Sequence, residues 1–132
     1  MNDDLDLRQI REDLRAVSKG AFSKTYRLEI VAVVAAQEPP IWARRVAQAL
    51  QIPENIVSSE LSAYAEMGAL QHFPLEHDRR KVYQLSPHPI WQFGRDLVGR
   101  TIHERHSENA EEFLVAFWSA LLDGSEPRAM PG

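Results

Sequence analysis

The segment PENIVSSELS contains one amide and three hydroxyl side chains, those of Asn55, Ser58, Ser59 and Ser62. A helix turns once every 3.6 residues, so this spacing places all four side chains on one helical face. Asparagine can pair bidentately with adenine, and serine can form hydrogen bonds with base edges or phosphates. The pattern therefore indicates a helix face with the chemistry needed to read duplex DNA.

Basic side chains lie on either side of this segment rather than within it. Residues 53–67 contain no lysine or arginine, and three glutamates stand there instead. Cations that flank a reading helix can contact phosphates and hold the protein in register on the duplex. The expected backbone contacts are Arg44, Arg45, Arg79, Arg80 and Lys81. A solvated hairpin tip is the other interpretation of residues 79–81, where Glu76 and Asp78 dilute the positive charge.

The overall charge and composition limit the class of protein. The chain has 132 residues, a net charge of −4 and no cysteine, which excludes disulfides and thiolate metal sites. Segments 1–40, 41–85 and 86–132 each lack a basic surplus, which counts against strong non-specific affinity for DNA. The acidic start, MNDDLDLRQI, does not resemble a secretory signal, and the apolar run 113–122 is shorter than the roughly 20 residues that span a bilayer. We expect a soluble, cytoplasmic protein with no membrane partner.

The histidines do not form a metal-binding pattern. In HERH, His103 and His106 are three residues apart, whereas the zinc-protease motif places two histidines four apart with a glutamate after the first. His72, His77 and His88 are scattered along the chain. The sequence also shows no nucleophile with a plausible base and no glycine-rich phosphate loop. We therefore expect surface histidines, no metal, no cofactor and no enzymatic activity.

Hydrophobic periodicity predicts the elements that would position these groups. We expect a mainly α fold with a small β-hairpin, in a single domain over residues 1–124 with a core at 23–86 and a flexible tail at 125–132. The expected helices are 4–19, 23–37, 41–50, 55–67, 90–106 and 107–123, and the expected strands are 69–75 and 81–85. Gly20 and Gly68 are expected to end the first and fourth helices. In helix 55–67, Val57, Leu61 and Tyr64 should face the core.

Three segments carry a resemblance to known regulators. TYRLEIVAVVA is similar to the opening helix of ArsR-type proteins, which often contains Arg-Leu-x-Ile, here residues 27–30. WARRVAQALQIPENIVSSELSAYAEMGAL resembles the tri-helical motif of the ArsR and MarR families, with Gln51 where the turn usually has a small residue. DRRKVYQLS resembles the returning strand of their wing. The resemblance implies a winged helix-turn-helix transcriptional regulator with recognition helix 55–67 and wing 70–85, and in that motif the second helix enters the major groove.

The flanking helices, 4–19 and 90–123, are expected to mediate dimerisation. Residues 113–122 are apolar over most of a helical circumference, and the first helix carries a narrow apolar stripe. A two-fold homodimer would bury both surfaces and would bind a pseudo-palindromic site, with half-sites about one helical turn apart. The alternative is a monomer in which these helices cover the domain's own core. The expected interface residues are Leu7, Ile10, Leu14, Phe113, Phe117, Trp118 and Leu121.

A second functional hypothesis keeps the scaffold without the DNA. The acidic helix and the negative net charge are compatible with a protein-interaction module that docks a basic protein partner. In that case Glu54, Glu60 and Glu66 would form the docking surface.

Overall fold

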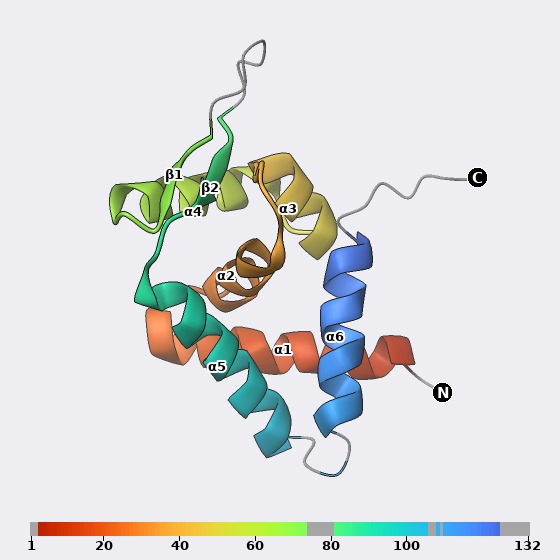
Figure 1. Cartoon of the computed structure of the whole chain (residues 1–132). Coiled ribbons are helices and arrows are strands. Elements are labelled where there is room, and N and C mark those ends of the chain that lie inside the picture. Colours follow the sequence, from red (N-terminus) through yellow and green to blue (C-terminus); the bar gives the residue numbers. More distant parts are fainter. Residues whose placement is uncertain (1–2, 74–80, 106–107, 109, 125–132) are drawn as a thin grey trace, which may run out of the picture.

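The computed structural model describes residues 3–73, 81–105, 108 and 110–124, and within these it describes residues 3–7 and 120–124 by their backbone alone. The elements are α1 (Asp3–Phe22), α2 (Arg27–Ala36), α3 (Ala43–Leu50), α4 (Glu54–Glu66), β1 (Leu70–His72), β2 (Tyr83–Leu85), α5 (Pro89–Arg105) and α6 (Ala110–Gly124) (Figure 1). The expected fold class, mainly helical with a small antiparallel sheet, is confirmed. Within the described residues, no helix is both long and apolar enough to cross a membrane.

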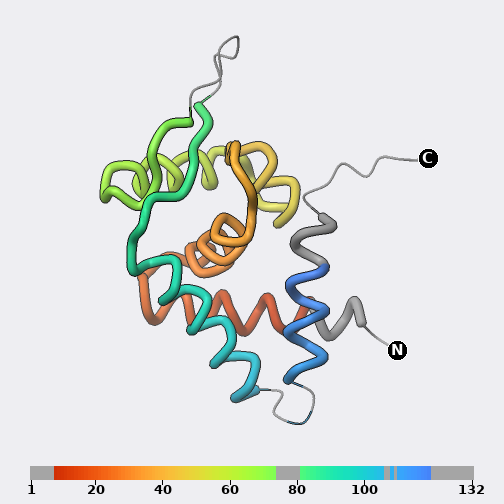
Figure 2. Tube along the Cα trace, in the orientation of Figure 1, coloured from red at the N-terminus to blue at the C-terminus, as the bar shows by residue number. Residues whose placement is uncertain are grey.

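Helix α2 occupies the centre of the fold. Its sequence is apolar nearly all round, and every residue from Leu28 to Ala35 is buried. It contacts α1, α3, α4, α5 and α6. Along the chain trace, α1 runs beneath α2, while α3 and α4 lie above it (Figure 2). A helix without a polar face is stable in this position because neighbours cover its whole circumference.

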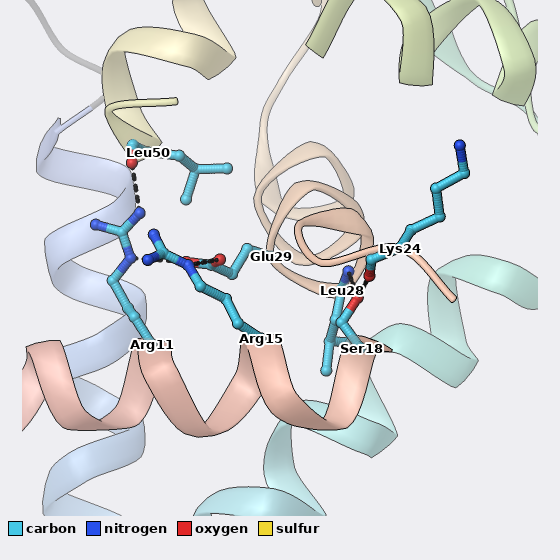
Figure 3. A network of polar contacts seen from close by, with 7 residues as sticks. All are labelled: Arg11, Arg15, Ser18, Lys24, Leu28, Glu29 and Leu50. Atoms are coloured by element: carbon cyan, nitrogen blue, oxygen red, sulfur yellow. Dashed lines mark hydrogen bonds and ion pairs between the residues drawn. The ribbon is translucent and has the colours of Figure 1, made fainter. Parts of the chain in front are cut away.

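One charged residue interrupts this apolar helix. The Glu29 side chain has 0% exposure and accepts hydrogen bonds from Arg11 Nε and Arg15 Nε of α1, each at 2.7 Å. Arg11 Nη2 also donates to the carbonyl oxygen of Leu50, the last residue of α3 (Figure 3). A buried carboxylate is tolerated only when its charge is paired and hydrogen-bonded. This network therefore holds α1 against both α2 and the end of α3.

The α1–α2 corner differs from the sequence prediction. Helix α1 continues through Gly20, the expected stop, and ends at Phe22, after which Ser23 adopts a left-handed φ of 61°. The next helix begins at Arg27 rather than at residue 23. Its first turn is satisfied from α1, because the Ser18 hydroxyl accepts from the Leu28 N–H at 3.0 Å and donates to the Lys24 carbonyl. A contact between two helices, rather than a local stop signal, thus sets this boundary.

The start of α3 also differs from the prediction. Ile41 was expected within the helix, but it forms an antiparallel bridge with Tyr83, through hydrogen bonds of 2.9 and 2.8 Å. Local propensity does not explain this difference, since isoleucine is compatible with a helix or a strand. The extended backbone at Trp42 (φ −143°, ψ 160°) allows the bridge to form. The sheet itself pairs Leu70 with Leu85 and His72 with Tyr83. Ile41 therefore ties the hairpin to the start of α3.

The turn between α3 and α4 is tight. Gln51 adopts a left-handed conformation (φ 55°), and the Ile52 N–H donates to the Ala47 carbonyl at 3.2 Å. At the other end of α4, Gly68 has a φ of 88°, which confirms its expected role as the stop of this helix. The Trp91 indole N–H then lies 3.1 Å from both the Ala69 and Ser86 carbonyls, so α5 holds the base of the hairpin.

Three of the seven expected dimer-interface residues are buried within the single chain. Ile10, Leu14 and Phe117 are buried in the shared core, because α1 and α6 pack on α2 and on one another. The expectation that these three side chains face a partner subunit is therefore wrong. Phe113 and Trp118 are partly buried against the same core. The side chains of Leu7 and Leu121 lie outside the described residues.

The close approach of α5 to α2 at Gly94 predicts that a larger side chain there destabilises the protein. A Cβ added at Gly94 of α5 would lie 2.4 Å from Val31 Cγ1 of α2, whereas one added at Gly99 of the same helix would meet nothing within 4 Å. Overpacking typically costs about 1–3 kcal/mol, and replacing helical glycine by alanine regains up to about 1 kcal/mol. We expect Gly94→Ala to lower the free energy of unfolding by about 1–2 kcal/mol in urea denaturation, and Gly99→Ala to raise it. Equal effects of the two substitutions would contradict the close α2–α5 contact.

Removal of the buried Glu29 carboxylate is expected to cause a larger loss of stability. Glu29→Ala would leave the Arg11 and Arg15 guanidinium groups without their shared partner. We expect a loss of about 3 kcal/mol in the free energy of unfolding, at the lower end for a broken buried pair because both arginines keep some access to solvent. Glu38→Ala, at an exposed position just beyond α2, is the matched control and should change stability little. Similar losses for both variants would show that the Glu29 network contributes nothing specific.

Candidate nucleic-acid interface

The outward face of α4 is polar, as the sequence predicts. Glu54, Asn55, Ser58, Ser59 and Ser62 are exposed. On the opposite side, Val57, Leu61 and Tyr64 are buried, which confirms the predicted core face of this helix. Because the apolar side is covered by α2 and α3, the amide and hydroxyl groups have only one direction in which to point. They form a continuous strip along the surface of α4.

A cleft borders one edge of this strip, and we call it the α3–hairpin cleft. It has a volume of about 420 Å³ and is lined by Trp42, Ala43, Arg44, Glu54, Ser58 and Lys81. Three residues singled out from the sequence, Arg44, Ser58 and Lys81, therefore meet here from three different segments. The two other hairpin cations, Arg79 and Arg80, lie outside the described residues.

The charges in the α3–hairpin cleft favour an anion. Arg44 Nε lies 3.8 Å from Glu54 Oε1, but the two side chains are 70% and 56% exposed. Exposed pairs of this kind contribute only about 0–1 kcal/mol, so Arg44 can exchange Glu54 for another anion at little cost. Helix α3 also begins at this cleft: its N-cap residue, Trp42, makes no side-chain cap hydrogen bond, and its first turn has no acid. The positive end of the α3 dipole adds to the field of Arg44 and Lys81.

Arg45 is less available than its neighbour. It is half-buried, and its guanidinium carbon lies 5.9 Å from the centre of the Trp42 ring. A cation over an aromatic face is held by electrostatic attraction to the ring. Of the two arginines expected to contact the backbone, Arg44 is thus the one placed in the cleft.

A second cleft borders the other edge of the strip, and we call it the corner cleft. It has a volume of about 410 Å³ and is lined by residues 23–26, between α1 and α2, by Arg27 at the start of α2, and by Asn55, Ile56, Ser59 and Glu60 of α4. Residues 23–27 were expected to be helical and were not among the predicted site residues. The two clefts lie along different edges of the same exposed helix face.

A polar network forms the floor of the corner cleft. Arg27 Nε donates to Glu60 Oε1 at 2.8 Å, and Arg27 Nη2 donates to Glu60 Oε2 at 3.2 Å. The buried Tyr64 hydroxyl donates to the same Oε1 at 2.7 Å. The hydrogen bond with Glu60 is the main reason that the pKa of Arg27 is raised. Burial, with the negative charge of Glu60, raises the pKa of Tyr64 well above its ordinary value. The network fastens α4 to α2 through charge held inside the protein.

This network corrects one expectation about the acidic helix. Glu60 was expected on a docking surface with Glu54 and Glu66, but it is buried beside Arg27. The sequence reasoning missed both buried carboxylates, Glu29 and Glu60. A usable signal was present at Glu29, since a single acid in an otherwise apolar helix requires a cationic partner. No comparable signal marked Glu60, which stands among other polar residues of α4.

The described residues contain no group of three or more His, Asp or Glu side chains arranged to hold a metal ion. His103 is exposed, and its Nδ1 lies 2.9 Å from the Gly99 carbonyl of its own helix. His106 lies outside the described residues. The chain matched no protein-family model, no curated protein and no solved structure at a significant level. We therefore infer the function from the geometry of the site.

The Tyr64 hydroxyl predicts a pH-dependent stability. Tyr64→Phe removes a hydrogen bond to a buried charge, so we expect it to lower the free energy of unfolding by about 1.5–3 kcal/mol at pH 8. The folded-state pKa of Tyr64 is raised above the unfolded value, near 10, so wild-type stability falls as the unfolded tyrosine ionises above that pH. The phenylalanine variant lacks this loss, and the stability gap should narrow by about 1.4 kcal/mol at pH 11. Urea denaturation at both pH values measures the gap. A gap that stays constant would contradict the assigned pKa direction.

Proposed function

We propose that the chain is a winged helix-turn-helix protein that binds duplex DNA as a homodimer and regulates transcription. Helices α2, α3 and α4 would form the tri-helical unit, and the β1–β2 hairpin would form the wing. The observation that carries the proposal is the meeting of Arg44, Ser58 and Lys81 in the α3–hairpin cleft, beside the exposed polar face of α4. In this type of motif the second helix lies in the major groove, and the preceding helix crosses the backbone.

On this surface the cations lie on the segments beside α4, and the uncharged polar groups lie on α4 itself. This distribution suggests that the neighbouring segments bind phosphates while α4 reads the bases. Arg44 and Lys81 would contact phosphates, which supply affinity without sequence preference. Asn55, Ser58, Ser59 and Ser62 would meet base edges, with Asn55 suited to adenine. The exposed Glu54 can accept from a cytosine amino group, and its negative charge disfavours other base edges by repulsion.

The rival hypothesis, a protein-interaction module, has less support from the same surface. It requires a run of carboxylates along α4, but Glu60 is buried and paired with Arg27. Glu54 and Glu66 are the exposed acids that remain on this helix, and Glu54 lies near Arg44. The acidic character of α4 is therefore weaker at its surface than in its sequence.

The homodimer remains part of the proposal, with a different set of contacts. Val115 of α6 is 65% exposed, and Trp118, three residues further along the same side of the helix, is only partly buried. A second copy could cover this side of α6 while Ile10, Leu14 and Phe117 stay in the core. Two copies of α4 would then meet successive major grooves, and the bound site would be an inverted repeat.

Selection of bound fragments from a random duplex pool tests the proposal. We expect an inverted repeat, and we expect Arg44→Ala and Lys81→Ala to weaken binding to all sequences. Each change should also reduce the slope of log affinity against log salt by about 1, because one phosphate contact is lost. Asn55→Ala should instead alter the preference at one base pair in each half-site.

The matched control is Arg100→Ala, which removes an exposed cation from α5 with the same change in net charge. It should leave affinity and salt slope close to those of the wild type. Failure of the wild type to retain any duplex at low salt would contradict DNA binding. A stoichiometric protein partner recovered in its place would favour the rival hypothesis.

A further inference from the structure

The corner cleft lies on the opposite edge of the α4 face from Arg44 and Lys81. Glu54 and Ser58, one helical turn apart, line the α3–hairpin cleft, whereas Asn55 and Ser59, also one turn apart, line the corner cleft. Successive residues of a helix are rotated by about 100°, so these two pairs form the two sides of one exposed face. A ligand that lies along this face therefore has a cleft on each side of it.

The corner cleft has an exposed lysine and exposed hydroxyl groups at its rim. Ser23, Lys24 and Thr25 are exposed. The charge of Arg27 is taken up by Glu60 at the floor, while among the described residues Lys24 forms no ion pair. The backbone of Lys24 is anchored, since its carbonyl accepts from the Ser18 hydroxyl. Its side chain extends away from α1 and from the Arg11–Arg15–Glu29 network (Figure 3). The rim of the corner cleft therefore carries a positive charge on a backbone segment that is held in place.

The dimensions of the major groove suggest what the corner cleft could bind. The groove is about 12 Å wide, and a helix with its side chains is about 10–12 Å across. A helix that lies in the groove therefore has a phosphate backbone on each side, one from each strand. One strand would lie along the α3–hairpin cleft, and the other would lie along the corner cleft.

We propose that Lys24 and Thr25 form a second phosphate contact, on the DNA strand opposite to the one held by Arg44 and Lys81. This inference rests on the proposed function and adds to it the residues that engage the second strand. Lys24 supplies the positive charge, and the Thr25 hydroxyl supplies a hydrogen-bond donor to a phosphate oxygen. Neither residue reads a base, so together they add affinity and fix the orientation of α4 without changing its sequence preference.

The test uses the full chain and the duplex selected by the wild type. Lys24→Ala should weaken binding and lower the salt slope by about 0.9, the value for one phosphate, with the selected sequence unchanged. Lys19→Ala is the matched control, because Lys19 is an exposed lysine five residues earlier that does not line the cleft. Thermal unfolding of both variants should match the wild type, since neither side chain is buried.

Single neutral methylphosphonates in the duplex locate the contact. In the wild type, neutralising the contacted phosphates should weaken binding. Lys24→Ala should lose sensitivity at one phosphate, and Lys81→Ala should lose it at a phosphate on the other strand, across the same major groove. The inference is overturned if Lys24→Ala behaves like Lys19→Ala, or if both sensitive phosphates lie on one strand. In those outcomes the wild type still binds DNA and the proposed function stands. A wild type that binds no duplex overturns both.

Discussion

The carboxylate of Glu29, on the central helix α2, has no exposure to solvent, and Arg11 and Arg15 of α1 each donate a hydrogen bond to one of its two oxygens. A buried charge without partners would be strongly destabilising, so α2 can occupy the core only with α1 laid across it. Arg11 extends this constraint to the last carbonyl of α3, just before the turn into α4. The ion-pair network between α1 and α2 therefore also fixes the end of α3 from which the chain turns into α4.

A second internal network completes the support of α4. Glu60 points inward, where Arg27 and Tyr64 satisfy its oxygens, and the helix therefore carries charge on its inner side. Its outer side carries uncharged hydrogen-bonding groups apart from the residues near its ends. This arrangement separates two tasks. The buried ion pair fixes the helix against α2. In the proposed function, the exposed amide and hydroxyl groups bind DNA. Affinity for phosphate must then come from cations on the neighbouring segments.

Much of the helical layout could be predicted from periodicity, and the buried side of α4 at Val57, Leu61 and Tyr64 was among the correct assignments. The helix boundaries that were predicted wrongly share one cause. Gly20 is a good local stop signal, but Phe22 packs against the core and the helix continues to it. Ile41 suits a helix or a strand, and its hydrogen bonds with Tyr83, distant in the sequence, decide the outcome. Local propensity is a weak influence that tertiary contacts override.

The sequence by itself determined the helical class, the polar strip on α4 and the position of its stop at Gly68. These follow from short-range spacing and from the conformational freedom of glycine, which need no knowledge of distant partners. Only the tertiary structure decided that Glu60 faces inward, that Ile10, Leu14 and Phe117 belong to the core, and that residues 23–27 lie beside α4. The physical reason is that the pattern within one segment shows which face is apolar, but not which distant segment covers that face or pairs with its charges.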